Sequence, residues 1–108
     1  MKNNPQPEDT SVDMRKYETF PAKPSSSHEI WCYPGDAWKM ACALVGKYDA
    51  QQYNTYRSLF FAMQDEDLFR RILVETLDIF QHSRNIRSPA GLLYSQLAGA
   101  ISSVAHGK

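Results

Sequence analysis

One segment, residues 65–82, constrains the fold of this chain more than any other. The residues of one face recur at positions i, i+1, i+4 and i+5, which is typical of an amphipathic α-helix. They are Leu68, Phe69, Ile72, Leu73, Thr76, Leu77 and Phe80. Asp65, Glu66 and Asp67 open the segment and suit the positive end of a helix dipole. A helix of this kind needs other helices or a sheet to cover its apolar face.

Three further segments predict helices, and no pair of alternating strands with a glycine turn accompanies them. Asp36 is placed as an N-cap, and Gly46 as a stop, for the first of these helices. Ser88 is placed as the N-cap of the last, with Pro89 at its first position. The expected helices span 37–47, 50–63, 66–82 and 89–105. Residues 30–33 are expected to be extended, as a lone strand or a packed entry segment. The predicted fold is all-α, a small four-helix bundle-like domain over residues 28–108.

The apolar faces of these helices predict one core, because 108 residues leave no room for two. The residues expected in it are Trp38, Val45, Phe60, Leu68, Ile72, Leu77, Leu97 and Ile101. Arg70 and Arg71 are expected on a solvated face, paired with acids four residues earlier on the helix.

Residues 1–27 predict a flexible N-terminal arm. They contain four of the six prolines and few apolar residues, so they cannot bury enough surface to offset their ordering entropy. Tyr17 and Phe20 are the expected anchors within the arm. Their spacing of three would place them on one face of a helix formed on a partner. The alternative is that they tuck against the chain's own domain.

Charge and chemistry exclude several functions. Twelve Lys and Arg balance twelve Asp and Glu, so there is no chain-wide basic field for nucleic acid. No catalytic motif is present, and we expect no enzymatic activity. A zinc set drawn from His28, Cys32, Cys42 and His82 lacks the spacing of a closed zinc site. We therefore expect no metal and no cofactor. Cys42 lies in an apolar helical context and is expected to be a buried free thiol.

The last third of the chain is depleted in acid. Asp78 is its last acidic residue, and Arg84 and Arg87 flank the helix start at Ser88. Free backbone amides, the helix dipole and two guanidinium groups would converge there on a phosphate or carboxylate. The alternative is that Arg84 binds the last carbonyl groups of the preceding helix.

A second feature of the last helix is a row of small residues at every fourth position: Gly91, Ser95, Gly99 and Ser103. Such a row lets another helix approach closely. We expect the helix over 66–82 of the same bundle to be that neighbour. A second copy of the chain or a partner protein is the alternative.

The segment from Arg84 to Leu93, RNIRSPAGLL, resembles a stretch found in plasmid- and phage-type replication initiator proteins. Those proteins show basic and aliphatic residues followed by Asn-Pro-Ala-Gly at a helix start, and Ser88 stands here in place of the Asn. The resemblance covers about ten residues. It implies an association with replication, and backbone contacts by Arg84 and Arg87.

These features leave two functional hypotheses. The first is a small accessory protein of a plasmid, phage or integrative element, which contacts nucleic acid or a replication or transfer complex through its basic C-terminal third. The second is a protein–protein interaction module, a regulator or inhibitor that docks a larger complex without touching nucleic acid. Both predict a cytoplasmic protein with a protein partner and no membrane contact, and a homodimer remains open.

Overall fold

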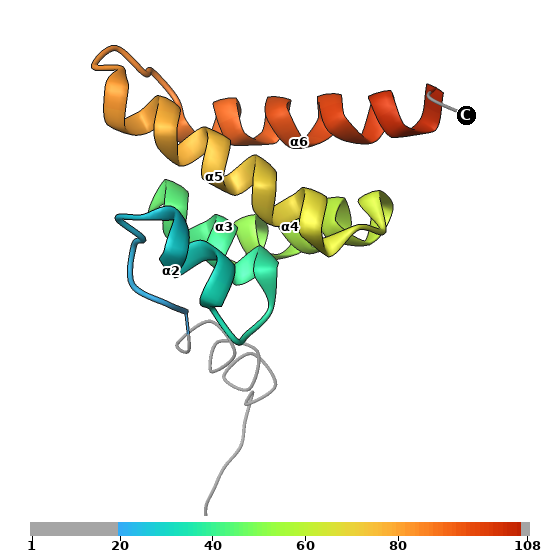
Figure 1. The fold of residues 1–108 in the computed structure, drawn as a ribbon, viewed down its shortest axis with the longest axis horizontal. Coiled ribbons are helices and arrows are strands. Elements are labelled where there is room, and N and C mark those ends of the chain that lie inside the picture. Colours follow the sequence, from blue (N-terminus) through green and yellow to red (C-terminus); the bar gives the residue numbers. More distant parts are fainter. Residues whose placement is uncertain (1–19, 107–108) are drawn as a thin grey trace, which may run out of the picture.

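The computed structural model describes residues 20–106, and within that range it contains five helices and no strand. The helices are α2 (Ser27–Cys32), α3 (Ala37–Val45), α4 (Ala50–Met63), α5 (Glu66–His82) and α6 (Pro89–His106). The all-α prediction is therefore confirmed, and the four long helices lie where the sequence places them. Helix α5 is central, because it packs against each of the other four (Figure 1). In the same view α6 lies along one side of α5 and α2 along the other.

Local signals explain where most of these helices begin and end. Asp65 accepts a hydrogen bond from the amide of Leu68 at 3.0 Å, and Ser88 accepts one from Gly91 at 3.0 Å. Gly46 ends α3 in the left-handed region, at φ 74°, which glycine adopts without steric penalty. Asp36 is the N-cap of α3, but its side chain makes no capping hydrogen bond, so that part of the prediction is wrong.

The core lies where α3, α5 and α6 meet α4. Four of the predicted core residues are buried: Trp38, Ile72, Leu77 and Leu97. The other four are partly buried and pack against that core: Val45, Phe60, Leu68 and Ile101. Cys42 is buried and free, as expected, and the exposed Cys32 is free as well.

Helix α2 replaces the extended segment expected over residues 30–33. A serine run starts it: Ser26 accepts a hydrogen bond from the amide of Glu29. The Glu29 carboxylate in turn accepts from the amide and the hydroxyl of Ser25, both at 3.0 Å. Serine caps and a glutamate reaching back are the elements of a helix N-terminus, and here the two serines lie at the end of the segment predicted as an arm.

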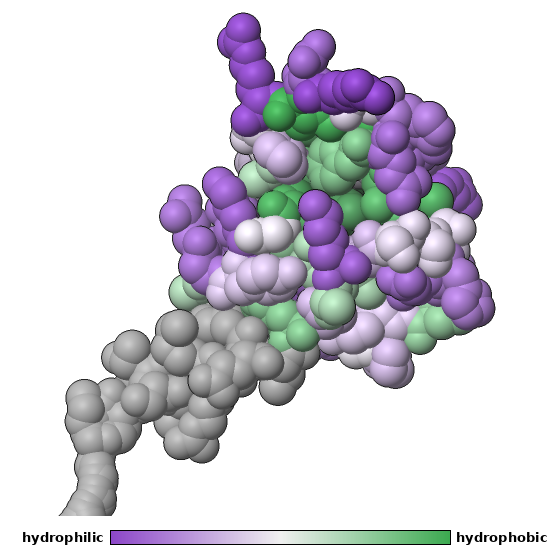
Figure 2. Space-filling model, turned by 90° about the vertical axis from the view of Figure 1, so that its left-hand side faces the viewer, coloured by the Kyte–Doolittle hydropathy of each residue, from purple (hydrophilic) through white to green (hydrophobic). Residues whose placement is uncertain are grey.

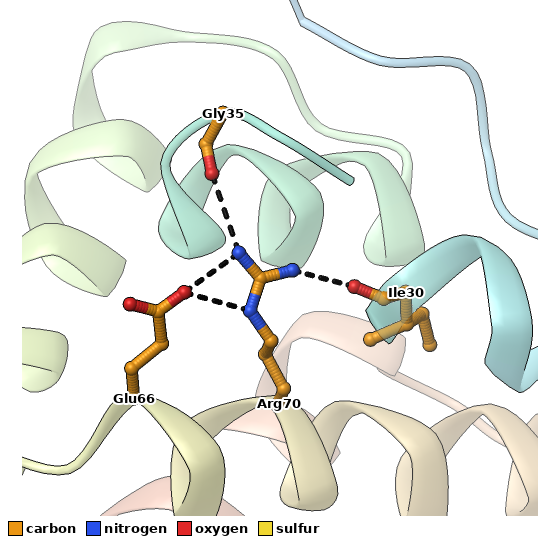
Figure 3. A network of polar contacts seen from close by, with 4 residues as sticks. All are labelled: Ile30, Gly35, Glu66 and Arg70. Atoms are coloured by element: carbon orange, nitrogen blue, oxygen red, sulfur yellow. Dashed lines mark hydrogen bonds and ion pairs between the residues drawn. The ribbon is translucent and has the colours of Figure 1, made fainter. Parts of the chain in front are cut away.

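Arg70 joins α2 to α5 and is buried, which corrects the expectation of a solvated side chain. Its ion pair with Glu66 is present at 2.7 Å, as the spacing predicted. Its guanidinium also donates to the carbonyl oxygen of Ile30 at 2.6 Å, and more distantly to that of Gly35 at 3.4 Å (Figure 3). The carbonyl of Ile30 lies four residues before Pro34, which has no amide hydrogen to offer. Arg70 thus supplies the donor that the end of α2 lacks.

Candidate functional site

The turn between α5 and α6 carries the residues that the sequence singled out. Helix α5 ends at His82, whose ring nitrogen Nδ1 lies 3.2 Å from the Asp78 carboxylate. The chain then turns through residues 83–88 and enters α6 at Pro89. The Ser88 hydroxyl already accepts from the amide of Gly91, so one of the free amides expected at this helix start is satisfied within the chain.

A hollow of about 210 Å³ lies beside this turn and holds one of the predicted arginines. Its lining combines two cations with an apolar surface. The lining residues are Lys23, Leu44, Val45, Phe80, Ser83, Arg84, Ile86 and Pro89. We call it the basic hollow. It is built from five parts of the chain: the segment before α2, the end of α3, the end of α5, the α5–α6 turn and the first residue of α6. No sequence signal pointed to Lys23, because only the fold brings it to Arg84.

Arg84 is exposed, and among residues 20–106 it makes no hydrogen bond or ion pair. The alternative in which Arg84 binds the last carbonyl groups of α5 is therefore not what the structure shows. Arg87 is also exposed, but it does not line the basic hollow, and neither does Ser88. Arg84 thus shares the basic hollow with Lys23 and not with Arg87 or Ser88.

A second hollow, of about 560 Å³, lies along the C-terminal half of α5 and has the opposite charge. It is lined by Ser27, Val74, Glu75, Leu77, Asp78, Ile79 and Gln81. Figure 2 views the molecule from the side on which α5 ends, and it shows hydrophobic surface between projecting hydrophilic side chains. The neutral net charge of the chain therefore hides local surfaces of opposite sign.

The row of small residues on α6 does not pack against α5. Gly91, Ser95, Gly99 and Ser103 are all exposed, whereas the buried Leu93 and Leu97 face the core. A Cβ built on Gly99 would meet nothing within 4 Å. The expectation of close packing within the bundle is wrong, because a row at every fourth position fixes only that the residues share a side of α6.

Of the two expected arm anchors, Tyr17 lies outside the described residues. Phe20 packs against the domain: its ring centroid lies 5.4 Å from that of Tyr48 and 6.1 Å from that of Tyr53. Pro24 is buried, and the carbonyl of Ser25 accepts a hydrogen bond from the side-chain amide of Gln81 at 2.9 Å. The segment just before α2 is therefore held against the domain, which is how Lys23 reaches the basic hollow.

No reactive or metal-binding group stands out among the described residues. Burial, helped by nearby Asp49, raises the pKa of the Cys42 thiol to about 12, so it stays protonated and a poor nucleophile at neutral pH. The exposed Cys32 lies 3.5 Å from His28 Nδ1. Within residues 20–106, no group of three or more His, Cys, Asp or Glu side chains lies close enough to hold a metal ion.

No family model, curated protein or solved structure matches this chain. In the part of the chain that the structure describes, no helix combines the length and the apolarity needed to cross a bilayer.

Proposed function

We propose that this chain is a non-enzymatic interaction module that binds an acidic segment of a protein partner at the basic hollow. The observation that carries the proposal is that Lys23 and Arg84 line the same hollow. Apolar side chains, those of Val45, Phe80 and Ile86 among them, line it as well. Two cations suit one or two carboxylates, and the apolar lining suits hydrophobic side chains beside them.

The same composition argues against nucleic acid as the ligand of this hollow. Binding to a phosphate backbone gains its affinity from many cationic contacts, and a protein that makes about six to ten of them binds much more weakly as the salt concentration rises. The hollow offers only two cations, set among polar and apolar lining groups. An accessory role in a plasmid or phage replication or transfer complex, as the resemblance of residues 84–93 implies, fits a protein ligand equally well. The two free thiols fit a cytoplasmic location.

Nucleic-acid binding is the second candidate, and one observation favours it: no acidic residue follows Asp78. In that case Arg84 and Arg87 would both contact phosphates, because both are exposed on the α5–α6 turn. The two candidates therefore differ in what they require of Arg87, which lies outside the hollow.

Fluorescence anisotropy separates the two candidates. The probes are a labelled peptide that alternates Asp or Glu with Leu or Phe, its Asn/Gln counterpart, and labelled single- and double-stranded DNA at two salt concentrations. We expect the acidic peptide alone to bind. Lys23→Glu and Arg84→Glu should each weaken it at least about tenfold, a change of about 1.4 kcal/mol.

Arg87→Glu is the matched control, since it reverses an exposed charge on the same turn but outside the hollow. It should leave peptide binding unchanged. Salt-sensitive DNA binding that both Arg84→Glu and Arg87→Glu weaken would replace the proposal with the nucleic-acid candidate. Equal binding of the acidic peptide and its Asn/Gln counterpart would show that the two cations do not select the ligand.

A further inference from the structure

The basic hollow lies next to the point at which the described chain begins. Phe20 is the first described residue, and Lys23, which lines the hollow, follows three residues later. Three residues of chain span at most about 11 Å. Packing fixes both ends of this stretch, because the Phe20 ring packs against two tyrosines and Pro24 is buried. The 19 residues that precede Phe20 are therefore tethered a short distance from the two cations.

One part of those residues has the composition that the hollow is proposed to bind. Residues 8–14, with the sequence EDTSVDM, contain three carboxylates and no base. We call them the acidic segment. Its carboxylates are those of Glu8, Asp9 and Asp13, and its apolar side chains are those of Val12 and Met14. The hollow offers the complement, two exposed cations beside apolar side chains.

We infer that the acidic segment occupies the basic hollow of its own chain. The inference rests on the proposed function, since it takes the hollow to bind acidic peptide, and it names a ligand within the chain. Seven residues of chain lead from Asp13 to Phe20 and span at most about 25 Å. That reach is more than twice the span from Phe20 to Lys23, so the segment can turn back to the hollow. Arg15 and Lys16 lie between the segment and Phe20. The two cations repel them, so the carboxylates are the part that the hollow selects.

The tether gives the acidic segment an advantage over a free ligand of the same composition. A tether of this length holds the segment at an effective concentration in the millimolar range, about 2 mM. A segment that binds with a dissociation constant of about 1 mM then leaves the hollow open in about one third of the molecules. An external acidic ligand competes with the segment, and its measured affinity is about threefold weaker as a result.

Amide NMR spectra of the full chain test this inference with two variants of the acidic segment. The apolar variant, Val12→Ser with Met14→Ser, changes no charge, so it separates contact from a long-range effect of charge. Each variant should shift the amide signals of Lys23 and Arg84, because the segment no longer fills the hollow. The signals at the opposite end of α5, residues 66–70, should stay in place. The acid variant replaces the three carboxylates with amides: Glu8→Gln, Asp9→Asn and Asp13→Asn.

Asn3→Ser with Asn4→Ser is the matched control, since it alters the same part of the chain outside the acidic segment. It should leave the signals of Lys23 and Arg84 unmoved. If neither segment variant moves these two signals, the inference is overturned. Shifts that appear only at high protein concentration would also overturn it, because they would place the segment in the hollow of a second copy.

Fluorescence anisotropy with the labelled acidic peptide separates this inference from the proposed function. Both segment variants should bind the peptide about threefold more tightly than the unmodified chain, and the control should bind as the unmodified chain does. Equal peptide affinities throughout, still weakened by Arg84→Glu, would overturn the inference and keep the proposed function. NMR shifts in segment variants that bind no peptide would keep the inference and overturn the proposed function, leaving the hollow to the chain's own segment.

Discussion

Replacing Arg70 with methionine tests the reasoning about how α2 is held. Methionine keeps an unbranched apolar stem of similar reach, so the packing of the Arg70 stem is largely preserved. The guanidinium and its hydrogen bonds are lost. The carbonyl of Ile30 then has no donor, since Pro34, at the position that would continue the helix ladder, lacks an amide hydrogen.

The structure allows the size of the effect to be worked out bond by bond. The hydrogen bond from a charged donor to the buried Ile30 carbonyl contributes about 1.5–3 kcal/mol. The ion pair adds less, because the Glu66 side chain is 53% exposed and regains water when its partner is removed. An exposed pair of this kind contributes about 0.5 kcal/mol. The contact with Gly35, at 3.4 Å, is too long to add much. Arg70→Met should therefore lower the free energy of unfolding by about 2–3.5 kcal/mol.

Urea denaturation followed by circular dichroism measures this loss, and two further variants isolate its cause. Arg71→Met changes the neighbouring arginine of the same helix, which is exposed, and should stay within about ±0.5 kcal/mol. Glu66→Gln removes the charge of the ion pair but leaves the bond to Ile30, and should lower stability by less than about 1 kcal/mol. Equal losses for Arg70→Met and Glu66→Gln would mean that the ion pair, and not the bond to Ile30, holds α2.

Four other measurements follow from the structure. Tyr56→Phe should raise the free energy of unfolding by about 1 kcal/mol, because the buried hydroxyl finds no hydrogen-bond partner among the described residues; a loss of stability in urea titrations would contradict this. Asp65→Ala should lower thermal stability by about 1 kcal/mol and Asp36→Ala hardly at all, since only Asp65 caps its helix with a side-chain bond. Burial raises the pKa of Cys42 from 9.0 to about 12, so stability should be full below pH 9.0 and fall as the pH rises toward 12. In native protein a thiol reagent should modify Cys32 alone; fast modification of Cys42 would show that its site opens readily.

The sequence predicted the elements that are specified by neighbouring residues. Helices α3 to α6 carry apolar residues at helical spacing. Gly46, Asp65 and Ser88 mark helix ends, and each of them acts on backbone groups only a few residues away. A helix as short as α2 shows too little periodicity to be recognised. The serines that cap its start belong to a polar, proline-containing segment that also suits a flexible arm.

What the sequence could not predict depends on contacts between distant residues. The burial of Arg70 follows from its bond to Ile30, forty residues earlier. Arg84 and Lys23 likewise line one hollow only because the segment before α2 lies against the end of α5. The side of α6 that carries the small residues could be derived from the spacing, but which neighbour that side faces is decided by the packing of the whole bundle.

The tie between Ile30 and Arg70 also has a consequence for ligand affinity. Helix α2 packs chiefly on α5. It directly follows the segment that carries Lys23, so its packing helps to hold that segment in place. Local opening of residues 20–32, with the remaining helices intact, would carry away one of the two cations of the basic hollow. The apparent dissociation constant of an acidic ligand then equals its intrinsic value divided by the fraction of molecules in which this segment is closed. A substitution at Arg70, remote from the hollow, would weaken binding without touching the ligand, and saturating ligand would in turn slow amide hydrogen exchange in α2.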